Sequence, residues 1–163
     1  MENENAPERV QFREDVLWLQ DEIPKLIEKG RLLKVNCRTM HYFSPQRDGY
    51  TIYGREFWAE KGSIIVGKIH RYSTINFIMA GSVLVAAEYG NDRIAAPAIF
   101  VSPGGAKRAL LVEEDVTWAT VHLTRFGSEA DLEKMEDELI APSYESLGLL
   151  ASIEQLKLKE RTQ

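Results

Sequence analysis

The sequence predicts a mainly β protein in which a β-barrel is flanked by helices at its N-terminal and C-terminal ends. Between residues 32 and 124, short runs of β-branched and aromatic residues alternate with turn residues, a pattern typical of barrels and sandwiches. On either side of that stretch, apolar residues recur at helical spacing instead. The 163 residues are 44% hydrophobic, which is one domain's length with enough apolar side chains for a core.

We divide the chain into three parts: an N-terminal tail and helix (1–31), the barrel (32–126) and C-terminal helices (127–163). Residues 1–8 are polar and acidic, so we expect them to be disordered and not to act as a signal peptide. A helix is predicted from Arg9 to Lys29. Pro24 interrupts it, which predicts a kink or two shorter helices, and Gly30 is suited to ending it.

Eight strands are predicted in the barrel part, separated by turn-forming residues. They are expected at 33–43, 50–58, 63–70, 75–79, 82–88, 97–102, 108–112 and 116–124. The turns are expected at Arg47-Asp48-Gly49, Lys61-Gly62, Ala80-Gly81, Gly90-Asn91-Asp92, Pro103-Gly104-Gly105 and Glu113-Glu114-Asp115.

Helical periodicity returns after the last predicted strand. Ser128 is placed to cap a helix that runs to about Ile140, because a serine side chain accepts hydrogen bonds from the first free backbone N–H groups. Pro142 ends that helix, and a final helix is expected near 143–160.

Charge and composition exclude several classes of function. The net charge is −5, whereas a nucleic-acid-binding protein needs a basic surface to neutralise phosphates. No apolar run is long enough to span a membrane. The single cysteine, Cys37, excludes an internal disulfide and fits a reducing compartment. We therefore expect a cytoplasmic protein that binds neither nucleic acid nor membrane.

Two spacing motifs in the barrel part point to a site. The first is G-x5-K-x-H-x3-T-x6-G, and the second is P-x-G-x2-R. Residues two apart on a strand share a face, which in a closed barrel is the lumen. The first motif contains Gly62, Lys68, His70, Thr74 and Gly81, and the second contains Pro103, Gly105 and Arg108.

Over residues 50–124 these spacings resemble the two motifs of the cupins, which are β-barrel or jelly-roll proteins. The resemblance implies a metal site made by His, His, Glu and His, but the corresponding residues here are Lys68, His70, Thr74 and Arg108. Only His70 is a good metal ligand, because lysine and arginine are cations that donate hydrogen bonds. We therefore expect no metal and no cofactor, and leave open a different site made by His41, His70 and His122.

The same replacements favour a small anion. Lys68 and Arg108, joined by Lys107, would place several positive charges near one cavity, where arginine can bind a phosphate or carboxylate through two hydrogen bonds. The alternative is that Glu56 or Glu88 neutralises these cations in a structural ion-pair cluster. Arg55 either pairs with Glu56 or lines the barrel mouth.

Trp118, Thr120 and His122 share one face of the last predicted strand. Facing inward, they add an aromatic wall and a histidine to the pocket; facing outward, they form surface or a subunit interface. We favour the inward arrangement. The residues predicted to bind the ligand are Lys68, His70, Tyr72, Asn76, Lys107, Arg108, Trp118 and His122.

A second resemblance is to small cupin-like proteins of tailed phages and prophages without assigned function, and it implies a viral protein in the host cytoplasm. Three of the segments that carry it are Gly67-Lys68-Ile69-His70, Phe100-Val101-Ser102-Pro103 and Glu114-Asp115-Val116-Thr117-Trp118.

Three hypotheses follow. In the first, the barrel binds a small anion of the nucleotide type and acts as a sponge for a host immune signal, without turnover. In the second, it is a metal-free enzyme acting on a sugar nucleotide or nucleotide signal, with His70 or His122 as the base and Tyr53 or Tyr72 as the acid. In the third, it is a structural or host-protein-interaction component. Homo-oligomers are expected in all three cases, because the amphipathic terminal helices offer apolar faces.

Overall fold

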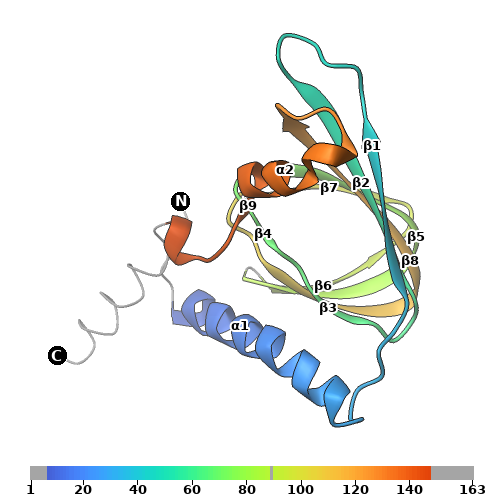
Figure 1. Cartoon of the computed structure of the whole chain (residues 1–163). Helices are drawn as coiled ribbons and strands as arrows, with labels where there is room; N and C mark the ends of the chain where they lie inside the picture. Colours follow the sequence, from blue (N-terminus) through green and yellow to red (C-terminus); the bar gives the residue numbers. More distant parts are fainter. Residues whose placement is uncertain (1–6, 89, 148–163) are drawn as a thin grey trace, which may run out of the picture.

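A curved antiparallel sheet forms the body of the protein (Figure 1). The structure is a computed structural model, and it describes residues 7–88 and 90–147. The strands are β1 (Cys37–Phe43), β2 (Thr51–Ala59), β3 (Ile64–Val66), β4 (Ile69–His70), β5 (Thr74–Ala87), β6 (Gly90–Ala95), β7 (Ala98–Ser102), β8 (Arg108–Thr124) and β9 (Ile140–Ala141).

The main sheet has the order β1-β2-β8-β5-β6, with β3 paired to β8 and β7 paired to β5, and β4 pairs separately with β9. The helices are α1 (Pro7–Glu28) and α2 (Leu132–Leu139), with 3-10 turns at Glu129–Asp131 and Glu145–Leu147. The prediction of a mainly β protein with helices at both ends is confirmed. No helix in the described part of the chain has the length and apolar character needed to cross a membrane.

The first helix differs from the prediction at its start and in its interior. It begins at Pro7, inside the segment expected to be disordered, because proline fits the first helical position, where no backbone N–H is needed. Pro24 lies within the helix, so the chain does not form two shorter helices here. Gly30 ends the helix as predicted, with a φ of 65° and its N–H bonded to the carbonyl of Ile27.

Two pairs of predicted strands are single long strands. β5 replaces the strands expected at 75–79 and 82–88, and β8 replaces those at 108–112 and 116–124. At the expected Ala80-Gly81 turn, β5 continues with shifts in its register against β8. Glu113-Glu114-Asp115 lies inside β8, and β6 begins at Gly90, where a turn was expected.

The C-terminal segment also departs from the prediction. Ser128 forms no side-chain capping bond, and its hydroxyl donates to the Asp131 carboxylate instead. The helix itself is α2, and it starts only at Leu132, after the 3-10 turn. Of the helix expected near 143–160, residues 143–147 contain a 3-10 turn, and the remainder lies outside the described residues.

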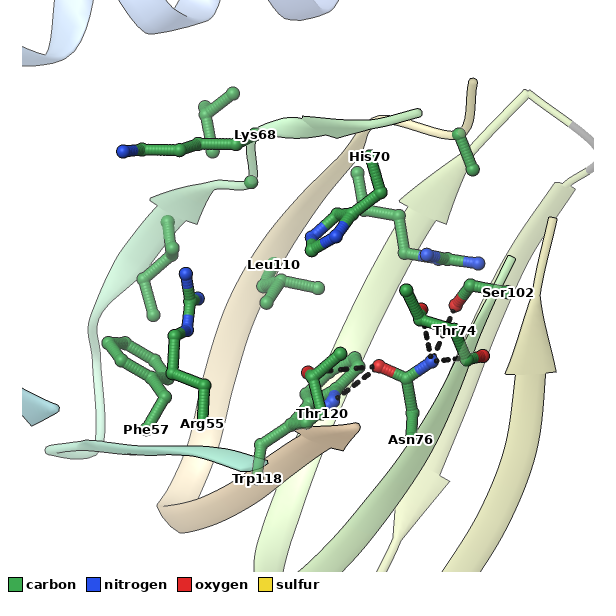
Figure 2. Close-up of a pocket in the computed structure, with 15 residues that line it drawn as sticks. Arg55, Phe57, Lys68, His70, Thr74, Asn76, Ser102, Leu110, Trp118 and Thr120 are labelled. Carbon is green, nitrogen blue, oxygen red and sulfur yellow. Dashed lines mark hydrogen bonds between the residues drawn. The ribbon is translucent and has the colours of Figure 1, made fainter. Parts of the chain in front are cut away.

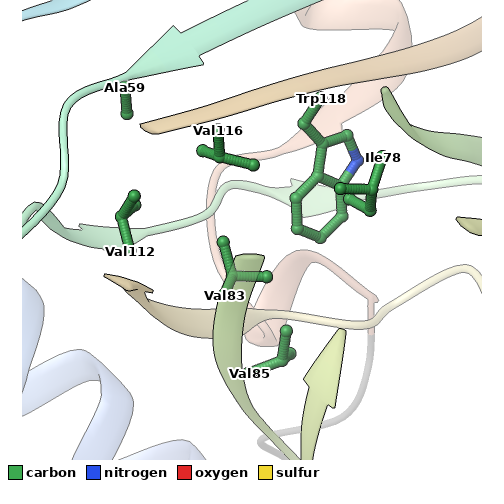
Figure 3. Packing of buried hydrophobic residues seen from close by; sticks show 7 residues of the cluster. All are labelled: Ala59, Ile78, Val83, Val85, Val112, Val116 and Trp118. Atoms are coloured by element: carbon green, nitrogen blue, oxygen red, sulfur yellow. The ribbon is translucent and has the colours of Figure 1, made fainter. Parts of the chain in front are cut away.

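The apolar core lies between the strands of the barrel (Figure 3). Its buried members are Ala59, Ile78, Val83, Val85, Val112, Val116 and Trp118. Two smaller clusters attach the helices. Val16 of α1 packs with Ile69 and Tyr144, and Met135 and Leu139 of α2 pack against Tyr53.

Candidate functional site

Two adjoining cavities occupy the part of the barrel that the apolar core leaves open. The first, of about 210 Å³, is lined by Lys68, His70, Arg108 and Trp118 among others (Figure 2). The second, of about 410 Å³, extends toward α2 and includes His122 in its wall. Both cavities border Arg55, Phe57, Lys68 and His70, so two of the cationic side chains, Arg55 and Lys68, lie where the cavities meet.

The cations of the lumen are not all neutralised. Lys68 forms an ion pair with Glu136 of α2, with both side chains about half exposed. In the described residues, no carboxylate forms an ion pair with Arg55 or Arg108. Burial lowers the pKa of Arg108, and its guanidinium lies 6.0 Å from the centre of the Phe100 ring. Partly buried charges without a counter-ion are costly, so this cavity favours an anion.

Glu56 and Glu88 were the predicted internal partners of these cations, and that alternative is wrong. The Glu88 carboxylate binds Arg9 and Arg13 of α1 at 3.0 and 2.9 Å. Glu56 accepts a hydrogen bond from the Tyr42 hydroxyl at 3.2 Å. Successive strand residues point to opposite faces, so Glu56 lies outside while its neighbour Arg55 lines the lumen.

All three histidines line the second cavity. The rings of His70 and His122 stack with centroids 5.0 Å apart, and His122 stacks in turn on Tyr53 at 5.8 Å. The Tyr53 hydroxyl and His41 Nδ1 are 2.7 Å apart and share a hydrogen bond. The histidines and Tyr53 therefore form one connected column along the wall.

The two stacked histidines are held in their neutral form. Burial, the neighbouring His122 ring and the positive charges of Arg55 and Arg108 lower the pKa of His70 to about 3. Burial and Arg55 lower the pKa of His122 to about 4. Nδ1 of His70 is buried and has no hydrogen-bond partner among the described residues.

Asn76 organises the polar end of the first cavity (Figure 2). Its amide nitrogen donates to the Ser102 hydroxyl at 2.8 Å and to Thr74 at 3.2 Å. Its oxygen accepts from Trp118 Nε1 at 2.9 Å and from the Thr120 hydroxyl at 3.2 Å. The Asn76 amide hydrogens are thus engaged within the protein, whereas the hydroxyl hydrogens of Ser102 and Thr74 remain available to a ligand.

The structure brings most of the predicted ligand-binding residues together. Trp118 and Thr120 line the first cavity and His122 lines the second, so this trio faces inward, as predicted. Whether these side chains contact a ligand remains a prediction.

Tyr72 and Lys107 do not line the lumen. Tyr72 is 60% exposed in a bend that follows β4, and it borders a separate surface pocket with Tyr50 and Arg125. Lys107 precedes Arg108 and points the other way, where its amine donates to Gln20 of α1 and to the carbonyl of Gly67. It fixes the helix to the barrel.

Sequence reasoning missed Ser102 and left Arg55 undecided. Arg55 lies on β2 between Tyr53 and Phe57, and all three side chains share the inner face of the strand. A charged residue at alternate positions with two aromatic residues is the signal that could have assigned it to the lumen. Ser102 carries no comparable signal, because serine before proline is equally typical of a turn.

The residues at the cupin metal positions do not fit a metal ion. Lys68, Thr74 and Arg108 replace three of the four ligands, and two of these are cations. The open alternative with His41, His70 and His122 is not supported either: across the described ranges, no group of three or more His, Cys, Asp or Glu residues is arranged to hold a metal. The His70 and His122 rings lie face to face, 11° from parallel.

No protein-family model and no curated protein matches the chain, whereas many solved structures are similar to it. The EutQ protein of Clostridium difficile is 12% identical, with a TM-score of 0.45 over 54% of this chain and 68% of that one. A cupin superfamily protein of Desulfitobacterium hafniense is 13% identical, with a TM-score of 0.42 over 53% and 77%. Salicylate 1,2-dioxygenase of Pseudaminobacter salicylatoxidans is 16% identical, with a TM-score of 0.48 over 79% and 36%. The antiparallel strands, with a helix before them and another after them, are consistent with a cupin fold.

Proposed function

We propose that the barrel binds a small anion without the help of a metal ion. The observation that carries this proposal is the pair of arginines, Arg55 and Arg108, which line one cavity without a carboxylate partner among the described residues. Guanidinium groups bind phosphate and carboxylate oxygens through paired hydrogen bonds. The free hydroxyl hydrogens of Thr74 and Ser102 complete a set of donors suited to an oxyanion.

Within this proposal, the ligand is of the nucleotide type. The phosphate would lie between the arginines, and the second cavity, of about 410 Å³, offers room for the rest of the molecule in the range of small-ligand sites, roughly 300–1,000 Å³. The column of His70, His122 and Tyr53 gives that cavity an aromatic wall. In the phage setting that the sequence resemblance implies, a binder of this kind would sequester a host nucleotide signal.

Isothermal titration tests the proposal against inorganic phosphate, nucleoside monophosphates, cyclic dinucleotides and ADP-ribose. We expect at least one of these anions to bind. Arg55→Gln and Arg108→Gln should each weaken binding at least tenfold, because each removes a charged hydrogen-bond donor worth about 1.5–3 kcal/mol. Arg93→Gln is the matched control, since Arg93 pairs with Glu113 on the exposed surface. If no anion binds, the proposal fails.

A second candidate, a metal-free enzyme, is favoured by one contact. Tyr53 shares a hydrogen bond with His41 in the wall of the second cavity, and burial raises the pKa of Tyr53, which keeps a proton on its hydroxyl. His70 and His122, with pKa values of about 3 and 4, are weak bases at neutral pH, and a general base works best with a pKa near the working pH. Turnover of a bound nucleotide that is lost in Tyr53→Phe, with binding intact, would favour this candidate over simple binding.

A further inference from the structure

A continuous apolar row crosses the outer face of the main sheet. Tyr42 of β1 is the register partner of Gly54 of β2, and Gly54 is the partner of Val121 of β8. Val121 pairs with Ile75 of β5, which pairs with Val101 of β7. Five neighbouring strands thus place an apolar or glycine residue at the same level, and the Tyr42 side chain lies against Gly54.

The neighbouring levels extend this surface in both directions. On one side, Ile99 of β7 pairs with Phe77 of β5, which pairs with Ala119 of β8. On the other side, Ile52 of β2 pairs with Leu123 of β8. The most exposed members are Ile99, Val101, Leu123 and Ile52, at 71%, 66%, 61% and 57%.

No described element covers this face. The helices lie on other sides of the barrel (Figure 1), where α1 packs beside Ile69 and α2 packs over Tyr53. From their exposed fractions, the apolar side chains on this face leave on the order of 700 Å² open, above the largest patch on a typical monomer and close to the roughly 800 Å² that each partner buries in a stable interface.

We propose that this outer face, defined by Ile52, Ile75, Ile99, Val101 and Leu123, pairs with the same face of a second copy of the chain. A surface with little charge can meet its own copy without repulsion, as a two-fold interface requires, even though the chain as a whole carries a net charge of −5. A charged partner would find no complementary charges at these five positions.

The proposed contact is independent of the lumen. Side chains alternate along each strand, so Ile75 and Leu123 point outward while their neighbours Asn76 and His122 line the cavities. Glu56, near β1, is the carboxylate in the neighbouring row, and Tyr42 satisfies it. The contact should therefore centre on β5, β7 and β8 and leave anion binding unchanged.

Sedimentation velocity over a range of protein concentrations tests the inference. We expect the wild-type full chain to be dimeric at micromolar concentration, and Ile75→Glu combined with Val101→Glu to be monomeric, with self-association at least 100-fold weaker. Leu33→Glu is the control, because Leu33 is 82% exposed but lies outside the sheet, and it should remain dimeric.

Ile99→Lys provides a second variant with little risk to folding, since 71% of Ile99 already faces solvent. It should also weaken the dimer, with an unchanged circular dichroism spectrum. A monomeric wild type at every concentration would overturn the inference. So would an oligomer that all the face variants preserve, because its contact must then lie elsewhere.

Discussion

His70 shows how the lumen controls the state of a single residue. Its ring is buried against His122 and lies near Arg55, Arg108 and Lys68, and all of these lower its pKa, to about 3. In the unfolded chain a histidine has a pKa near 6.5. Folding thus stabilises the neutral ring, and this contribution is complete above about pH 6.5 and decreases as the pH falls toward 3.

We therefore predict an acid-dependent loss of stability that His70 and His122 cause together. Between pH 7.5 and 4.5, their contribution to the free energy of unfolding should fall by on the order of 1–3 kcal/mol each, at about 1.4 kcal/mol per pKa unit. Urea unfolding at both pH values measures it. His70→Gln should reduce the difference in unfolding free energy between the two pH values. His41→Gln is the comparison and should keep that difference, because His41 instead shares a hydrogen bond with Tyr53. An equal pH effect in all three proteins would contradict the prediction.

Asn76 carries the second prediction at this scale. Asn76→Leu keeps the side-chain volume but leaves Trp118 Nε1, buried in the wall, without its acceptor. We expect a loss of about 2–4 kcal/mol in the free energy of unfolding, since buried polar groups without partners cost about 1–3 kcal/mol each. Chemical denaturation checks it, and Asn91→Leu on exposed β6 should change stability by less than about 0.5 kcal/mol. A small effect at Asn76 would show that water replaces the lost acceptor.

Residue spacing alone predicted part of the site. The motif positions of Lys68, His70 and Arg108 all reach the first cavity. The strand predicted at 63–70 is divided into β3 and β4, however, and Lys68 lies between them. Tyr72 was misplaced because the regular alternation ends in the bend after His70. Arg55 was left undecided, although its alternation with Tyr53 and Phe57 was a local signal for the lumen. Its partner across the sheet, Thr120 of β8, belongs to a distant segment, and local patterns do not encode that pairing.

At the scale of elements, Gly81 explains why two predicted hairpins are absent. Its φ of 78° is what a turn glycine would have, and the sequence signal is the same for a turn and for a bulge in a continuing strand. Here the strand continues, because β8 lies directly against it: a Cβ on Gly81 would be 2.1 Å from the carbonyl oxygen of Asp115. The acidic run at 113–115 was predicted as a turn because the sequence does not show that β5 lies against it at Gly81. That contact holds the run in β8.

Gly81→Ala should accordingly be much more harmful than an equivalent change at another glycine. We expect a loss of at least about 3 kcal/mol, since the chain must relieve both the clash and the positive φ. Gly62→Ala is the matched control. Gly62 has a φ of 85° but open space around it, so its loss should be about 1 kcal/mol. Thermal unfolding of both variants gives the comparison, and similar losses would show that the close approach to Asp115 does not matter.

At the scale of the whole molecule, α1 is joined to the barrel by ion pairs between charged residues that lie far apart in the sequence. Glu88 was considered as a partner for the lumen cations, but Arg9 and Arg13 reach it from α1. Lys107 adds a second link through Gln20, one residue before Arg108. The helix therefore neutralises Glu88 and binds the amine of Lys107. Arg108, at the start of β8, is then the cation of this adjacent pair that faces the lumen.

This arrangement predicts that α1 detaches as a unit when Glu88 loses its charge. Glu88→Gln removes the carboxylate that binds the Arg9 and Arg13 guanidiniums, which are 9% and 1% exposed, and breaking a buried ion pair costs about 3–5 kcal/mol. Hydrogen exchange should be at least tenfold faster in α1, while the amides of β5 and β8 keep most of their protection because the barrel core does not involve the helix. Glu113→Gln, which breaks the exposed pair with Arg93, should change neither region, as surface pairs contribute only about 0–1 kcal/mol. Equal acceleration in helix and barrel would mean that the two unfold together, and the ion pair would then be part of one cooperative core.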